Sequence, residues 1–183
     1  MTYATAARDL HDFFVVAATS AATLAGLLFV GLSLHLRAVI AASEIRGLAR
    51  ITLANFGLVL FASMFMVLNE DRVAAGWQLV GTSIVTFVFA APSLLAATRS
   101  HELTAGMRRT DRVRFFLRFV MSALAYAAIA AAGALLLASQ VDAFSLVIQV
   151  AVVVLMVVAL RNTWDLLVTV AEVSSEDEPG RQR

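Results

Sequence analysis

The stretch from residue 144 to residue 160 reads FSLVIQVAVVVLMVVAL and contains no charged side chain. A helix of about 20 residues crosses the roughly 30 Å hydrocarbon core of a bilayer and satisfies its backbone hydrogen bonds internally. A run this apolar, preceded by Asp142 and followed by Arg161, predicts a transmembrane helix. We expect its helix to continue past the apolar part to about residue 173.

Four further stretches share this character, and they cover residues 13–36, 51–68, 77–97 and 119–139. Hydrophobic residues make up 61% of the chain and charged residues only 15%, which lies outside the range of soluble domains. The charges gather in the connections between the apolar stretches. The sequence therefore predicts an all-α fold, a polytopic membrane helix bundle with five transmembrane helices within residues 1–173. Residues 174–183 are expected to form a disordered acidic tail.

The arginines indicate the orientation of this bundle. The chain has 14 basic residues of the Lys and Arg type, and all of them are arginine. With five spans, twelve of them fall on one side of the membrane and only Arg8 and Arg72 on the other. Because cytoplasmic loops are enriched in basic residues, we expect the N-terminus outside and the C-terminus in the cytoplasm. The twelve are Arg37, Arg46, Arg50, Arg99, Arg108, Arg109, Arg112, Arg114, Arg118, Arg161, Arg181 and Arg183.

Several classes of chemistry lack the residues that they require. There is no cysteine, which excludes disulfides, thiolate metal sites and cysteine nucleophiles. His11 falls on the opposite side from His35 and His101, so the three cannot converge. His35 and His101 could share a ligand, or each could bond backbone or lipid headgroups. No hydrolase, zinc-protease or nucleotide-binding motif is present, so we expect no enzymatic activity, catalytic residue, metal site, cofactor or nucleic-acid partner.

The polar groups at depth in the predicted spans leave two interpretations open. None of the five apolar cores contains Asp, Glu or Arg, which argues against an ion-coupled carrier. The strongest polar groups are Asn55, which we expect one turn inside the cytoplasmic end, and Gln149, nearer the outer side. They could bond neighbouring helices, or they could line a polar path together with Ser83 and Thr86. Their different depths predict that the two amides do not bond each other.

The first span has a face almost free of bulk. Ala18, Ala22 and Gly26 repeat every four residues, and Thr19 and Thr23 flank them. Small residues at this spacing let another helix approach closely. The partner could be the alanine-rich segment 127–134 of the same chain or a helix of another subunit.

The connection before the fourth span carries a cluster of arginines beside the membrane. Such side chains favour an anionic cytoplasmic leaflet by about 1 kcal/mol each. We therefore expect contacts with lipid headgroups, and membrane lipids as partners. The cluster consists of Arg108, Arg109, Arg112, Arg114 and Arg118.

About the first third of the chain contains the segments FFVVA (13–17), AATLAGLLFV (21–30) and SLHL (33–36), followed by Arg46, Leu48 and Ala49. In these segments the chain resembles a group of small multi-pass proteins of actinobacteria and related bacteria. Some members carry the label "modulator of FtsH protease". The resemblance implies a bacterial inner-membrane protein that binds a membrane-anchored ATP-dependent protease and adjusts its access to substrates.

Taken together, these features predict a non-enzymatic protein of the bacterial inner (plasma) membrane. It would act through helix contacts, as a modulator or assembly partner of a membrane complex. The alternative is a small homo-oligomeric channel lined by Asn55, Gln149 and the serines and threonines of spans one and three.

Overall fold

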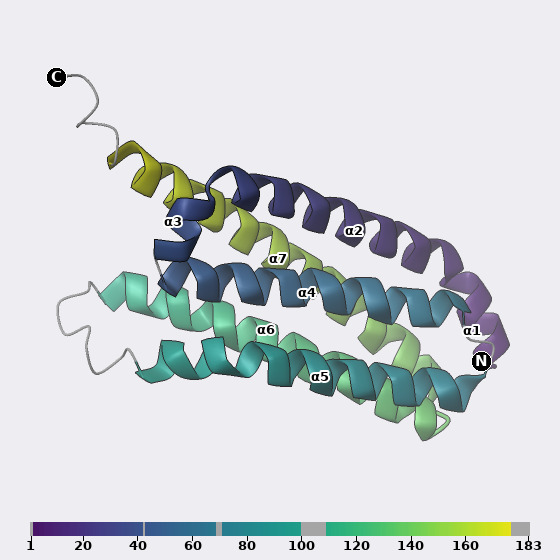
Figure 1. Ribbon diagram of the computed structural model, residues 1–183. Helices are drawn as coiled ribbons and strands as arrows, with labels where there is room; N and C mark the ends of the chain where they lie inside the picture. Colours follow the sequence, from purple (N-terminus) through teal and green to yellow (C-terminus); the bar gives the residue numbers. More distant parts are fainter. Residues whose placement is uncertain (1, 42, 69–70, 100–108, 177–183) are drawn as a thin grey trace, which may run out of the picture.

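The fold is organised around one helix, α4 (Ser43–Leu68), which is the most enclosed of the long helices. The computed structural model describes residues 2–41, 43–68, 71–99 and 109–176. Within these residues α4 packs against α2 (His11–Leu34), α5 (Arg72–Arg99) and α7 (Val141–Glu176). Helix α6 (Arg109–Leu137) packs between α5 and α7. Helices α4 to α7 thus form a four-helix bundle, and α2 lies outside it against α4 (Figure 1).

The described residues are all helical or in short turns, and five helices are long and apolar enough to cross a membrane. This confirms the predicted all-α bundle with five candidate spans. The spans are His11–Leu34, Ile45–Leu68, Arg72–Ser93, Val120–Leu137 and Val141–Ala171. They run alternately up and down the bundle, so that α1 (Tyr3–Asp9) and the end of α7 lie at opposite ends (Figure 1). We call these the α1 end and the α3 end, after α1 and α3 (Leu36–Ala41).

Helix α4 begins at Ser43, several residues before the apolar stretch that starts at Ile51. Its first turns bury Ile45, Leu48 and Ala49 at helical spacing. Average hydropathy misses such a segment because the arginines on its other face lower the mean. Helices α1 and α3 were also not anticipated. At the other end of the chain α7 continues to Glu176, and residues 177–183 of the expected tail lie outside the described residues.

Two glycines bring α5 and α6 into close contact. A Cβ added to Gly133 would lie 2.8 Å from the carbonyl oxygen of Gly76, a distance that real side chains do not reach. A Cβ added to Gly76 would lie 2.8 Å from Cγ of Leu137. The two helices can therefore cross at this depth only because both positions lack a side chain. Pro92 lies inside α5, which continues to Arg99.

Arg72 joins the start of α5 to the end of α6 at the α1 end. Its Nη1 donates to the carbonyl oxygen of Leu136, at 2.8 Å, and to Oγ of Ser139. These acceptors lie at the C-terminus of α6, where carbonyl groups lack helical partners and a cation is favourable. Ser139 has a φ of 65°, the left-handed conformation that often ends a helix. These hydrogen bonds of Arg72 hold the turn from α6 to α7 beside the start of α5.

Candidate functional site

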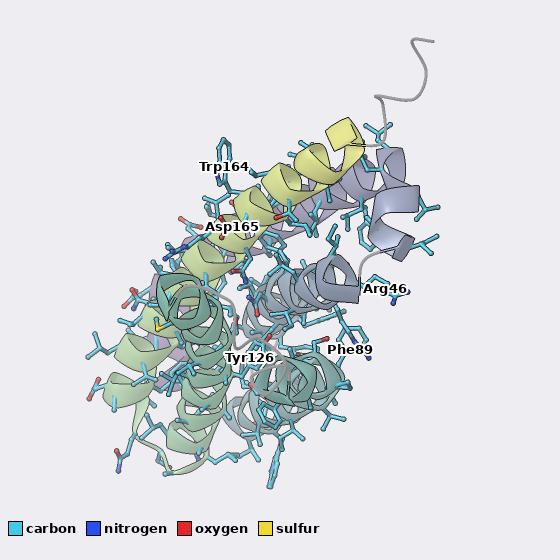
Figure 2. The ribbon with its side chains drawn as sticks, turned by 90° about the vertical axis from the view of Figure 1, so that its left-hand side faces the viewer. Arg46, Phe89, Tyr126, Trp164 and Asp165 are labelled. Atoms are coloured by element: carbon cyan, nitrogen blue, oxygen red, sulfur yellow. The ribbon has the colours of Figure 1, made fainter. Side chains whose placement is uncertain are left out.

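The strongest polar contact inside the bundle links α4 to α6. Asn55 is fully buried, and its Nδ2 donates to Oγ of Ser122 at 3.1 Å. The hydroxyl of Tyr126 donates to Oδ1 of Asn55 at 2.5 Å. Figure 2, viewed from the α3 end, shows Tyr126 among the helices of the bundle. The buried amide therefore bonds another helix, one of the two interpretations that the sequence left open.

Two polar residues of α5, Ser83 and Thr86, lie at the same level along the bundle as this contact. Arg50 lies over Phe89, with 4.4 Å from Cζ to the ring centroid, which sets the antiparallel register of α4 and α5. The Gly76 and Gly133 crossing sets the register of α5 and α6. When residues are counted along the helices from these contacts, Ser83 and Thr86 of α5 lie at about the same level as Asn55 of α4.

These residues form what we call the polar layer, a set of buried polar side chains midway along the bundle. Ser83 is only 2% exposed, and its hydroxyl has no hydrogen-bond partner. Thr86 is also buried. A buried polar group is favourable chiefly when it is bonded, and Asn55 is bonded to both Ser122 and Tyr126. The layer consists of Asn55, Ser83, Thr86, Ser122 and Tyr126.

Asn55 lies about 18 Å along α4, because this helix begins at Ser43, before the apolar stretch that starts at Ile51. Gln149 is half-buried, and its Nε2 donates to the carbonyl oxygen of Ser145 in its own helix, at 3.0 Å. The two amides have different partners, as expected. Of the predicted path residues, Asn55, Ser83 and Thr86 all lie inside the subunit.

Tyr126 was missed by sequence reasoning. It is one of two tyrosines and lies in an alanine-rich span, where it looks like an isolated aromatic residue. The signal was its spacing, because Ser122 and Tyr126 are four residues apart and share a helix face.

Four of the small residues of α2 lie on the face that points away from the bundle. The face toward α4 buries Phe14, Ala17, Ala21 and Leu28. On the opposite side Thr19, Ala22 and Thr23 are exposed, and a Cβ added to Gly26 would meet nothing within 4 Å. Ala18 is half-buried at the edge. We call Thr19, Ala22, Thr23 and Gly26 the open α2 face.

The open α2 face has no unsatisfied donor. Thr19 donates to the carbonyl oxygen of Val15 and Thr23 to that of Thr19, both at 2.8 Å. The open α2 face therefore behaves as an apolar surface, because both of its hydroxyls already donate to the backbone of α2. Helix α6, our internal candidate partner for α2, packs instead between α5 and α7.

Other predicted residues lie at the α3 end or beyond the described chain. Arg108 and His101 lie outside the described residues. Arg109, Arg112, Arg114 and Arg118 belong to the first turns of α6, where only the backbone is described.

The histidines that are described lie far apart. His11 begins α2, and Nδ1 of His35, at the other end of that helix, lies 3.3 Å from the carbonyl oxygen of Gly31. Within residues 2–41, 43–68, 71–99 and 109–176 no group of three His, Asp or Glu residues could hold a metal ion.

Two exposed tryptophans mark two levels along the bundle. Trp77 is 63% exposed and Trp164 is 70% exposed, and Trp164 points away from the helices in Figure 2. Both α5 and α7 begin at the α1 end. At 1.5 Å per residue, Trp77 lies about 8 Å and Trp164 about 35 Å from those starts. The difference of about 27 Å in position along the two helices is close to the thickness of a hydrocarbon core, and tryptophan favours its two boundaries.

Comparison with known proteins adds no further constraint. No protein-family model matches the chain, and no curated protein and no solved structure matches it. Three features of the molecule itself bear on its function: the polar layer, the open α2 face and the levels of the two tryptophans.

Proposed function

We propose that this chain is an integral protein of the bacterial inner (plasma) membrane, with its N-terminus outside and its C-terminus in the cytoplasm. Five long apolar helices and the levels of Trp77 and Trp164 support membrane insertion. The arginine asymmetry supports the sidedness. Of the two arginines at the α1 end, Arg72 has a separate task, because its side chain caps α6.

We further propose that the protein has no enzymatic activity and acts as an assembly partner or modulator of a membrane complex, through α2. The observation that carries this is the open α2 face. Among the five spans α2 is the least buried, and on its outward side the small residues of the open α2 face lie between larger exposed residues such as Val15 and Phe29. In lipid, helices associate where small residues let their backbones approach, because apolar surface alone gives no driving force.

A homo-oligomeric channel has weaker support. Residues that line a pore between identical subunits must lie on the surface of each subunit. Asn55, Ser83 and Thr86 are buried in the subunit, and Gln149 donates to the carbonyl oxygen of Ser145 in its own helix. The exposed Thr19 and Thr23 satisfy their hydroxyls within α2, which suits contact with a helix better than contact with water.

The decisive experiment compares two identical substitutions on different outward faces. Gly26→Leu adds bulk to the open α2 face, and Gly81→Leu adds the same bulk to the outward face of α5. A Cβ at either glycine would meet nothing within 4 Å, so both variants should fold. We expect partners that co-purify with the wild-type chain in mild detergent to be lost from Gly26→Leu and kept by Gly81→Leu.

Mass spectrometry of the purified complexes would measure this loss. A chain that purifies alone in every form and conducts solutes in liposomes would overturn the proposal in favour of the channel. Sidedness has its own test, because the chain has no cysteine and one introduced thiol is unique. In intact cells an impermeant maleimide should label Asp9→Cys at the α1 end and spare Thr169→Cys at the α3 end. The reverse pattern would contradict the orientation.

A further inference from the structure

One outward stripe of α4 combines two cations with an apolar surface further along the helix. Helix α4 is covered by α2 on one side and by α5 on another, but residues at spacings of three and four along its outer side stay accessible. We call this set the α4 stripe. From the α3 end upward it contains Arg46, Arg50, Gly57, Phe61, Met64 and Leu68.

The two arginines lie where the headgroups of one leaflet would be. Gly47 faces Ser93 of α5, about 32 Å from the start of that helix, so Arg46 lies close to the level of Trp164. Arg50 lies one helical turn deeper. Arginine side chains at this depth keep their charge by reaching toward the boundary.

The Arg50 guanidinium is positioned by an aromatic ring, which leaves its charge in place. Its Cζ lies 4.4 Å from the centroid of the Phe89 ring, and the buried Nε has no hydrogen-bond partner. A ring attracts a cation through its quadrupole and does not neutralise it. Figure 2 shows Arg46 and Phe89 together at one side of the bundle, with Asp165 on the other side of α4. The stripe therefore presents positive charge without the nearby carboxylate of α7.

The remainder of the α4 stripe is apolar and has room for a chain. Phe61, Met64 and Leu68 are 47%, 39% and 68% exposed. Between them and Arg50, a Cβ at Gly57 would meet nothing within 4 Å, so the surface is lowest there. An extended hydrocarbon chain could lie along this surface, parallel to the helix axis.

We propose that the α4 stripe is a binding site for one anionic phospholipid of the leaflet at the α3 end. The phosphate pairs with Arg46 and Arg50, whose forked donors match its oxygens, and an acyl chain lies over Gly57 toward Leu68. This proposal rests on the membrane insertion proposed above. It does not depend on any partner of the open α2 face.

The test uses the full-length protein in nanodiscs that contain phosphatidylglycerol and phosphatidylcholine. Native mass spectrometry counts the phosphatidylglycerol that the released protein retains. Arg46→Gln with Arg50→Gln should reduce this retention by about fivefold for each charge removed. Arg161→Gln is the matched control, because Arg161 is an exposed arginine at a similar level on α7 and should leave retention unchanged.

Two further variants separate the site from folding and from general surface charge. Arg46→Gln alone changes an exposed side chain and should still lower retention if the double variant folds poorly. Gly57→Leu fills the low point without changing charge and should lower retention of both lipids. Equal loss with Arg161→Gln, or unchanged retention in Arg46→Gln and in Gly57→Leu, would overturn the site. Extraction of the wild-type protein from phosphatidylcholine vesicles by alkaline carbonate would instead contradict membrane insertion itself.

Discussion

Helices α4 and α2 run side by side and are both long and apolar, yet they handle their polar residues in opposite ways. The span within α4 is 56% buried and that of α2 only 22%. In α4, Asn55 makes its hydrogen bonds to a different helix. In α2, the hydroxyls of Thr19 and Thr23 donate only to backbone carbonyl oxygens of α2 itself.

The contrast teaches how such a chain separates inside from outside when apolar residues cover both. In a soluble protein a hydrophobic face identifies the core, but in a membrane lipid is as apolar as the core. What differs between the core and the lipid-facing surface is which hydrogen-bond partners the polar side chains have. A polar group that bonds another helix fixes the register of the bundle, whereas one that bonds its own helix leaves that surface free.

The largest expected difference in stability is between substitutions at two glycines, Gly133 inside the bundle and Gly26 on the open α2 face. Gly133→Ala would place a Cβ 2.8 Å from a backbone oxygen of α5, which cannot move aside as a side chain can. We expect a loss of about 2 to 3 kcal/mol of stability from this overpacking. Gly26→Ala meets open space and should stabilise the chain by up to about 1 kcal/mol, because alanine favours the helix. Denaturant unfolding in micelles, followed by circular dichroism, measures both, and similar values would refute the α5 and α6 crossing.

Substitutions of the two amide side chains, Asn55 and Gln149, should differ less in their effect on stability. Asn55→Leu removes two bonds between helices and leaves the hydroxyls of Ser122 and Tyr126 without this partner. The expected cost is about 2 kcal/mol. Gln149→Leu removes a bond within α7 only and should change stability by less than about 0.5 kcal/mol. A double-mutant cycle of Asn55→Leu with Tyr126→Phe should show coupling, and strict additivity would mean that the hydrogen bond contributes nothing.

The hydroxyls give the smallest difference. Ser122→Ala removes the acceptor of the Asn55 Nδ2 and should cost about 1 kcal/mol. Thr23→Val removes a bond to its own helix on an exposed face and should change stability by less than about 0.5 kcal/mol. The same unfolding measurement applies. Equal effects at both positions would remove the distinction between α4 and α2.

Sequence alone predicted the five apolar helices because each needs only a long run without charge. It did not predict the first turns of α4, where Ile45 and Leu48 are buried beside arginines and the mean hydropathy is low. It anticipated that Asn55 and Gln149 would not meet, but it could not name Tyr126 as a partner. That contact depends on how α4 and α6 each pack against α5, and Gly76 and Gly133 set the register of α5 and α6.

The tryptophans provide a spectroscopic handle on the whole arrangement. The chain has two of them, both well exposed, one near each end of the bundle. In bilayers of brominated lipids, bromine atoms near the surface of either leaflet should therefore quench the tryptophan fluorescence more than bromine atoms at the bilayer centre. Replacing Trp77 by Phe would leave an optical probe of the α3 end alone, with no dye attached.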